Sequence, residues 1–186
     1  FDYPIISTNQ KYLKDVRKFL KKKKIKKYKV ILEPEKKNTA PAILASALLE
    51  EIPLNQPLMY LAADHLIEKP NVLNKSIYKN KFNLDDENIF IFGIKPSNPS
   101  SEYGYFLTKK VTNNIDKVTK FIEKPKTLLA KKIIKQKGYW NSGMFFLRKD
   151  SIINNFKKYQ PKTYKSCIMA IKKSIYKNNT YYLNKS

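Results

Sequence analysis

Residues Ile31–Glu50, ILEPEKKNTAPAILASALLE, contain the junction that decides the fold. The apolar run at its start ends in Glu-Pro and is typical of the end of a buried strand. The small apolar residues from Thr39 onward predict a helix, with Asn38 or Thr39 as N-cap and Pro41 in the first turn. Because the N-terminus of a helix presents unpaired N–H groups, this junction is a candidate ligand site.

Strands and helices alternate along the rest of the chain. We expect strands over 28–34, 57–65, 88–96 and 143–149, a short strand entered from the loop 97–106, and an alternating segment over 116–125. We expect helices over 9–24, 39–51, 70–81, 126–138, 150–159 and 162–177, and the start of a further strand at Tyr181-Tyr182. This pattern predicts one α/β domain over residues 1–186, with a largely parallel sheet and with ligands beyond the carboxyl ends of its strands.

The charge balance is strongly basic. Lys and Arg number 38 against 15 Asp and Glu, which gives a formal net charge of +23. Such a charge suggests a polyanion such as nucleic acid as partner. However, arginine, which makes forked contacts to phosphate and guanine, is present only as Arg17 and Arg148, and the lysines are spread along the whole chain. We therefore favour compositional bias with solvated lysines over a nucleic-acid interface.

The cysteine content and the length of the apolar runs argue against a disulfide-bonded or membrane-spanning protein. The single cysteine, Cys167, allows no internal disulfide, and its surroundings favour a small buried side chain over a nucleophile. No apolar run approaches the roughly 20 residues of a membrane span, and no signal peptide opens the chain. We expect a soluble, cytoplasmic protein without a membrane partner.

Charged side chains follow two of the predicted strands. Asp64 ends the apolar stretch PLMYLAADH, where it is either one ligand of a magnesium ion that also binds substrate phosphates or the cap of the next turn. Glu123 and Lys124 follow the 116–122 segment, where a carboxylate can accept hydrogen bonds from sugar hydroxyls and a lysine can neutralise a phosphate. Taken alone, this second pair is better explained as an exposed strand end with an incidental ion pair.

Two glycines and an asparagine complete the candidate set. Asn141 in GYWNSGMFF offers a donor and an acceptor for a sugar hydroxyl or a base edge, and Gly143 would let the backbone approach a ligand. Gly104 in YGYF marks either a similar close approach or a β-bulge. The alternative interpretation of GYWNSGMFF is a turn beside a core tryptophan.

Five segments, taken in order, resemble motifs of the bacterial mannose-1-phosphate guanylyltransferases, which belong to the sugar-1-phosphate nucleotidyltransferase superfamily. They are ILEPEKKNTAPA, LAADH, FGIKPSNPSSEYGYF, FIEKP and GYWNSGMFFLRK. The resemblance covers nearly the whole chain. It implies a Rossmann-like, GT-A-like three-layer α/β fold with a mostly parallel mixed sheet. It also implies Mg²⁺-dependent in-line transfer, in which GTP and mannose 1-phosphate give GDP-mannose and pyrophosphate.

The resemblance also implies roles for particular residues. It places Glu33, Pro34, Asn38, Thr39 and Ala40 at the guanine nucleotide. It places Gly104, Glu123 and Asn141 at the sugar, Lys124 at the sugar phosphate, and Asp64 at the metal, with Lys124 and Asp64 as the catalytic pair.

The sequence departs from the family pattern at both ends. It contains neither the family's glycine-rich triphosphate loop nor its second metal-binding aspartate, and Lys37 stands where an arginine is frequent. We therefore expect an internal fragment, truncated at both ends, that does not catalyse the reaction alone. The alternatives are a nucleotidyltransferase for another sugar phosphate, a non-catalytic subunit and, in a different class, a basic nucleic-acid-binding module. A homo-oligomer is compatible with the sequence.

Overall fold

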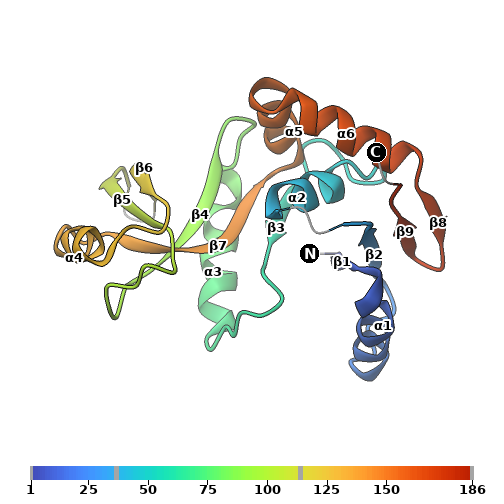
Figure 1. The fold of residues 1–186 in the computed structure, drawn as a ribbon, viewed down its shortest axis with the longest axis horizontal. Coiled ribbons are helices and arrows are strands. Elements are labelled where there is room, and N and C mark those ends of the chain that lie inside the picture. The colour runs from blue at the N-terminus through green and yellow to red at the C-terminus, as the bar shows by residue number, and fades with distance from the viewer. Residues whose placement is uncertain (1, 36–37, 113–114, 185–186) are drawn as a thin grey trace. The chain divides into compact units, whose positions relative to one another are not determined.

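The computed structural model describes residues 2–35, 38–112 and 115–184 (Figure 1). Contacts between residues divide the chain into two compact units. Unit 1 consists of Phe1–Gln56 and Arg148–Ser186, and unit 2 consists of Pro57–Leu147. The prediction that residues 1–186 form a single domain stays a prediction.

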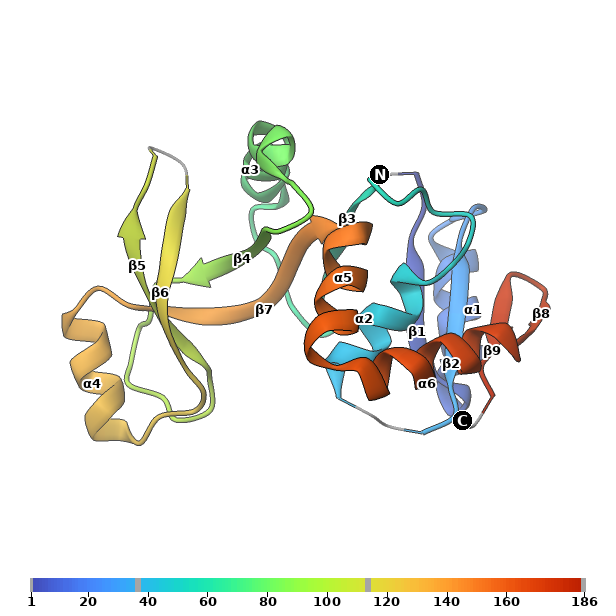
Figure 2. The same cartoon turned by 90° about the horizontal axis from the view of Figure 1, so that it is seen from above.

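Unit 1 is built on a four-stranded sheet in the order β1-β2-β9-β8. Its strands are β1 (Ile5–Asn9), β2 (Lys29–Glu33), β8 (Ile175–Lys177) and β9 (Thr180–Tyr182), and its helices are η1 (Gln10–Tyr12), α1 (Leu13–Lys22), α2 (Thr39–Ala47), α5 (Lys149–Tyr159) and α6 (Pro161–Lys172). β2 runs parallel to both β1 and β9, whereas β8 and β9 form an antiparallel hairpin. Figures 1 and 2 show α2 and α6 on one face of this sheet and α1 on the other.

The core of unit 1 explains why its first elements form. Val30, Ile31 and Leu32 of β2 are almost completely buried, as expected for a continuous apolar run in a strand covered on both faces. The small side chains of Ala45 and Ala47 in α2 are also buried, so the helix packs closely. The junction strand and the helix after it are therefore confirmed.

The predicted helix over 162–177 is correct only in its first part. α6 ends at Lys172, and the chain then forms the β8–β9 hairpin. Asn178 and Asn179 at its turn have φ values of 51° and 57°, a left-handed conformation that asparagine tolerates better than most residues. The further strand predicted at Tyr181-Tyr182 is β9, and it pairs with β2.

Unit 2 contains a five-stranded sheet in which β7 has three neighbours, β3, β4 and β5. The elements are β3 (Pro57–Tyr60), α3 (Pro70–Asn80), η2 (Lys81–Asn83), β4 (Ile89–Ile94), β5 (Tyr105–Lys110), β6 (Asp116–Ile122), α4 (Thr127–Lys135) and β7 (Tyr139–Arg148), the last residue of which belongs to unit 1. The β4–β7, β5–β7 and β5–β6 pairs are antiparallel.

The α/β class and the mixture of parallel and antiparallel pairs are confirmed. The sheets are not largely parallel as predicted: β1–β2 and β2–β9 in unit 1 are parallel, whereas β4–β7, β5–β6, β5–β7 and β8–β9 are antiparallel. The antiparallel β5–β6 pair follows from its short connection, because the five residues 111–115 between the two strands are too few for a parallel crossover. The strand predicted over 57–65 is shorter than expected: β3 ends at Tyr60 and is half-buried.

Two apolar clusters hold the helices of unit 2 on the sheet. Ile77, Leu84 and Phe146 form one cluster, which includes α3. Tyr105, Ala130 and Ile133 form the other, which includes α4 and has Trp140 packed against it. No helix in the described residues has both the length and the apolar character needed to cross a lipid bilayer.

Candidate functional site

The first group of candidate residues lies in unit 1, where β2 ends. The Glu33 carboxylate accepts a hydrogen bond from Ser7 Oγ at 2.7 Å, and the Glu33 backbone carbonyl accepts one from Asn9 Nδ2 at 3.4 Å. Ser7 and Asn9 belong to β1, which pairs with β2 in parallel, so the sheet itself orients Glu33. Sequence reasoning did not identify this support from β1.

The second part of this group opens helix α2. Asn38 occupies the predicted N-cap position, but its side chain makes no capping hydrogen bond. Asn38, Thr39 and Ala40 are exposed. Their polar atoms therefore face solvent at a helix N-terminus, where backbone N–H groups and the helix dipole favour anions. Lys37, where the family favours arginine, lies outside the described residues.

A cavity of about 560 Å³ adjoins this junction in unit 1. Glu33, Pro34, Pro41 and Ala45 line one side of it. The other lining residues include Lys162, Thr163, Ser166, Cys167 and Ala170 of α6. Asn38, Thr39 and Ala40 do not line this cavity. The α6 residues were not predicted as site residues, because their amphipathic helix carries no motif.

The second group lies in unit 2, where β5, β6 and β7 (Figure 1) bring Gly104, Glu123 and Asn141 together. The backbone N–H of Asn141 donates to the carbonyl of Gly104 at 2.8 Å. A Cβ atom on Gly104 would lie 2.8 Å from Glu123 Oε2. These three residues were all predicted at the sugar, and the antiparallel pairing of their strands is the reason they meet.

The Asn141 side chain has a fixed orientation. Its Oδ1 accepts a hydrogen bond from the backbone N–H of Gly143 at 3.2 Å. Gly143 has φ of +70°, a left-handed conformation that favours glycine. Within β7, Gly143 therefore presents its N–H to the Asn141 side chain, and the predicted close approach of its backbone to a ligand stays a prediction.

Lys124 follows Glu123 and carries a strained backbone. Its φ is 40°, in the left-handed region that costs energy for a residue with a Cβ atom, and Pro125 follows it. The Lys124 side chain is exposed, whereas Pro125 is buried. Strained backbone that the surrounding structure maintains is found most often at functional sites, so this observation supports a role for Lys124.

Asp64 does not stand at the tip of a strand as predicted. β3 ends four positions earlier, at Tyr60, and Asp64 is exposed in a turn. In the described part of the chain, no group of three or more His, Cys, Asp or Glu residues is arranged to hold a metal ion. A single exposed carboxylate fits Mg²⁺ only as one ligand among water and substrate phosphate oxygens, which is a common arrangement for this ion.

Burial and ion pairing shift the pKa values of several groups that support the fold of unit 1. Burial by itself would lower the pKa of Lys29, but a 2.7 Å ion pair with Glu51 outweighs burial and raises it. Burial by itself would raise the pKa of Glu51, but hydrogen bonds from Lys29 and Tyr181 outweigh burial and lower it. Burial lowers the pKa of Lys149, whose Nζ donates to the carbonyls of Leu49 and Ile52 at 2.8 and 2.7 Å.

Comparison with known proteins places this geometry in context. The sequence model described as nucleotidyl transferase matches residues 1–185. A Salmonella montevideo protein named mannose-1-phosphate guanylyltransferase is 33% identical over 180 residues, which are 92% of this chain and 38% of that protein. The alginate biosynthesis protein AlgA of Pseudomonas fluorescens is 29% identical over 181 residues, 93% of this chain and 37% of that protein.

Solved structures show a similar fold. A structure described as mannose-6-phosphate isomerase from Helicobacter pylori is 28% identical, with a TM-score of 0.85 over 98% of this chain and 72% of that chain. A structure described as mannose-1-phosphate geranyltransferase from Thermus thermophilus has a TM-score of 0.77 over 88% of this chain and 48% of that chain, at 22% identity. The chain spans 37–38% of the length of the two relatives above.

Proposed function

Because the chain belongs to the nucleotidyl transferase family, we propose that its residues serve guanylyl transfer from GTP to mannose 1-phosphate. The products are GDP-mannose and pyrophosphate. The observation that carries this proposal is the cluster of Gly104, Glu123 and Asn141 in unit 2, because it combines a carboxylate, an oriented amide and a glycine that leaves room beside them. The relatives named mannose-1-phosphate guanylyltransferase support the choice of sugar and nucleotide.

In the proposed reaction a phosphate oxygen of mannose 1-phosphate attacks the α-phosphorus of GTP. One P–O bond forms, the bond from the α-phosphorus to the bridging oxygen breaks, and pyrophosphate leaves with the electron pair. Nothing is oxidised or reduced, and no group on the protein is acylated or phosphorylated. The protein therefore contributes mainly by positioning two anions and offsetting their charge.

The sugar side of the reaction depends on unit 2. The Glu123 carboxylate accepts hydrogen bonds from sugar hydroxyls, and the Asn141 amide, oriented by Gly143, contributes further polar contacts. Lys124 supplies a compact positive charge for the sugar phosphate. Its left-handed backbone sets the direction in which this exposed side chain leaves the chain.

The nucleotide side depends on unit 1. Guanine presents N–H donors along one edge, and a carboxylate such as Glu33, held by Ser7, is a suitable acceptor. Asn38 and Thr39 add exposed polar groups at the N-terminus of α2, where an anionic ligand is favoured. Asp64 would hold Mg²⁺ together with substrate oxygens, and the ion would neutralise phosphate charge.

Three other functions are alternatives with different predictions. A nucleotidyltransferase for another sugar would prefer a different base and sugar. An isomerase would bind mannose 6-phosphate, the substrate named for the Helicobacter pylori protein. A nucleic-acid-binding module would need a steep fall in affinity with salt concentration.

A thermal-shift titration separates these alternatives. We expect GDP-mannose with Mg²⁺ to raise the melting temperature of the chain, and dTDP-glucose and mannose 6-phosphate to raise it much less. A larger shift with either control ligand would contradict the proposal, as would the absence of any shift in a chain that melts cooperatively. In parallel, we expect no GDP-mannose synthesis by this chain alone, and measurable synthesis would overturn that expectation.

A further inference from the structure

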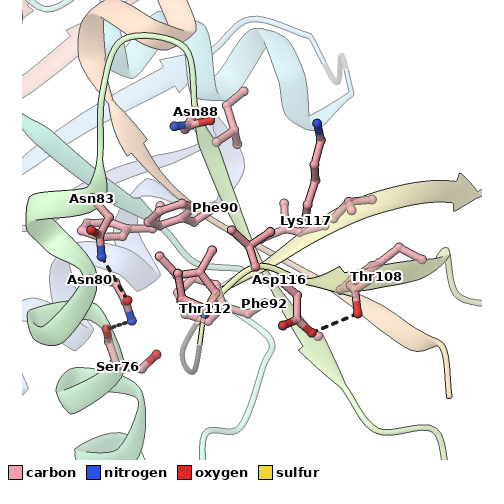
Figure 3. A pocket seen from close by; sticks show the side chains of 18 of the residues that line it. Ser76, Asn80, Asn83, Asn88, Phe90, Phe92, Thr108, Thr112, Asp116 and Lys117 are labelled. Carbon is pink, nitrogen blue, oxygen red and sulfur yellow. Dashed lines mark hydrogen bonds between the residues drawn. The ribbon is translucent and has the colours of Figure 1, made fainter.

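A separate cavity of about 720 Å³ lies within unit 2, between α3, β4 and the part of the β5–β6 hairpin nearest its turn (Figure 3). Its volume is in the range of about 300–1,000 Å³ that small-molecule sites occupy. None of the candidate residues Asp64, Gly104, Glu123, Lys124 and Asn141 lines it. We propose that this cavity is a second binding site, which takes an uncharged carbohydrate ring.

Aromatic rings form the apolar part of this cavity. Phe90, Phe92, Phe106 and Tyr139 all line it, and the rings of Phe106 and Tyr139 lie 5.8 Å apart between centroids. Phe90, Phe92 and Tyr139 are only half-buried, so each exposes part of its ring. A pyranose has one face made of C–H groups, and burying that face against aromatic rings removes apolar surface from water.

Amide and hydroxyl groups form the polar part. The Asn80 side chain, on α3, is 8% exposed, donates to the Ser76 carbonyl at 2.8 Å, and accepts from Asn83 Nδ2 at 3.4 Å. Across the cavity, Thr108 Oγ1 donates to Asp116 Oδ2 at 3.0 Å (Figure 3). These groups combine donors with acceptors, as the hydroxyl groups of a sugar require.

The charges of the lining decide which class of sugar fits. Asp116 and Lys117 are its only charged side chains among the described lining residues, one of each sign. A phosphorylated sugar or a nucleotide would require an excess of positive charge. In a chain with a net charge of +23, this balanced lining favours a neutral ligand.

Irregular strand pairing shapes both walls of the cavity. The β4–β7 register shifts between Ile91 and Gly93, which places Phe92 at the irregularity. The β5–β6 register shifts between Leu107 and Thr108. Such bulges occur preferentially next to binding sites, where they redirect a side chain, and here each one adjoins a residue that lines the cavity.

Gly93 allows the rings of Phe106 and Tyr139 to lie close to the backbone of β4. A Cβ atom on Gly93 would lie 2.9 Å from Phe106 Cζ and 2.9 Å from Tyr139 Cγ. Gly93 also pairs with Asn141 across β4 and β7. The two sites of unit 2 therefore share strands, although they share no lining residue, and binding at one can be measured separately from binding at the other.

Saturation-transfer NMR on the full chain tests this inference. The probes are methyl α-D-mannopyranoside, methyl β-D-glucopyranoside and maltose. We expect transfer to the C–H protons of at least one of these sugars. Replacing the ring by Phe92→Leu should weaken binding by about tenfold, and Thr108→Val, which removes a hydroxyl at nearly constant volume, should weaken it about threefold.

Glu102→Gln, an exposed change in unit 2 outside both sites, is the matched control and should leave the transfer unchanged. Far-UV circular dichroism tests whether each variant is folded. If Phe92→Leu does not fold, Thr108→Val gives the decisive result. The inference is overturned if none of the three sugars shows transfer. It is equally overturned if Glu123→Gln, in the other site of unit 2, abolishes transfer that Thr108→Val preserves. Because the probes carry no nucleotide, the absence of sugar binding in this cavity would not contradict the proposed guanylyl transfer. Failure of the guanylyl transfer proposal would likewise not contradict sugar binding in this cavity.

Discussion

Gly104 and Glu123 are so close that a Cβ atom on the glycine would lie 2.8 Å from Oε2 of the carboxylate. The contact joins the start of β5 to the end of β6, where Tyr105 pairs with Ile122. On the other side of β5, the Gly104 carbonyl accepts a hydrogen bond from the Asn141 N–H. Gly104 therefore contacts both the Glu123 carboxylate and the Asn141 backbone, which is the arrangement we assign to the sugar.

Gly104→Ala tests this relationship. The added methyl group would displace the flexible Glu123 carboxylate and press on the Phe121 ring, 3.0 Å away. We expect the affinity for GDP-mannose to fall by about tenfold, with the melting temperature almost unchanged. Ser101→Ala, an exposed change in the preceding loop, is the control. Unchanged affinity in folded Gly104→Ala would show that the carboxylate position is unimportant.

Lys149→Met tests the buried ammonium group of unit 1. Lys149 is 5% exposed, and the loss of its two hydrogen bonds leaves the carbonyls of Leu49 and Ile52 without that donor. We expect the free energy of unfolding to fall by about 2 kcal/mol. Urea denaturation followed by far-UV circular dichroism measures this. Lys165→Met, on the exposed surface of α6, should change it by less than about 0.5 kcal/mol. Equal effects of the two variants would contradict the assignment.

The Lys29–Glu51 pair predicts a pH dependence of stability. The pKa of Glu51 is held below its ordinary value of 4.5, so its contribution is present above that pH and is lost as the pH falls through the lower, folded-state value. The pKa of Lys29 is raised above 10.5, so its contribution is present below that pH and is lost as the pH rises through the folded-state value.

Glu51→Gln isolates the acid side of this dependence. We expect it to lower the free energy of unfolding by about 1 kcal/mol at neutral pH and to make the decline below pH 4.5 shallower. Glu102→Gln, which removes an exposed carboxylate in unit 2, should leave the acid decline as it is. Identical pH profiles for the wild type and Glu51→Gln would rule out the pair as the cause.

Trp140→Phe tests whether the buried indole N–H of Trp140 contributes to stability. Its Nε1 is buried and has no hydrogen-bond partner in the described part of the chain. Its ring lies 4.8 Å from Tyr103 and 6.4 Å from Tyr105, measured between centroids. Because Trp140→Phe removes the N–H group and keeps a ring, we expect it to change the free energy of unfolding by less than about 1 kcal/mol. A loss of several kcal/mol would contradict this expectation.

Periodicity was sufficient to predict most of the helices and strands near the motifs, although β3 ends before the LAADH motif. β2 and α2 follow the apolar pattern around Ile31 and Leu44, whereas α4 ends at Lys135, three residues before the predicted end at Gly138. These elements depend on local sequence and on one buried face, both of which can be read from a single chain.

Strand direction could not be predicted in the same way. Whether β7 runs antiparallel to β4 depends on contacts between Ile89 and Leu147, which are far apart in the sequence. The β8–β9 hairpin was missed although Asn178-Asn179 is a recognisable turn, because the helical spacing of 162–172 was extended beyond its end. The support of Glu33 by Ser7 and the α6 wall of its cavity likewise come from long-range packing without a motif.

Calorimetric titration of GDP-mannose with Mg²⁺ into the wild-type chain, Glu123→Gln and Glu102→Gln tests the central claim most directly. The Glu123 carboxylate should accept charge-assisted hydrogen bonds from the sugar, which its amide counterpart makes more weakly. We predict that the wild type and Glu102→Gln bind with the same affinity, and that Glu123→Gln binds about tenfold more weakly. Equal affinities for all three proteins would contradict the assignment of this cluster to the sugar.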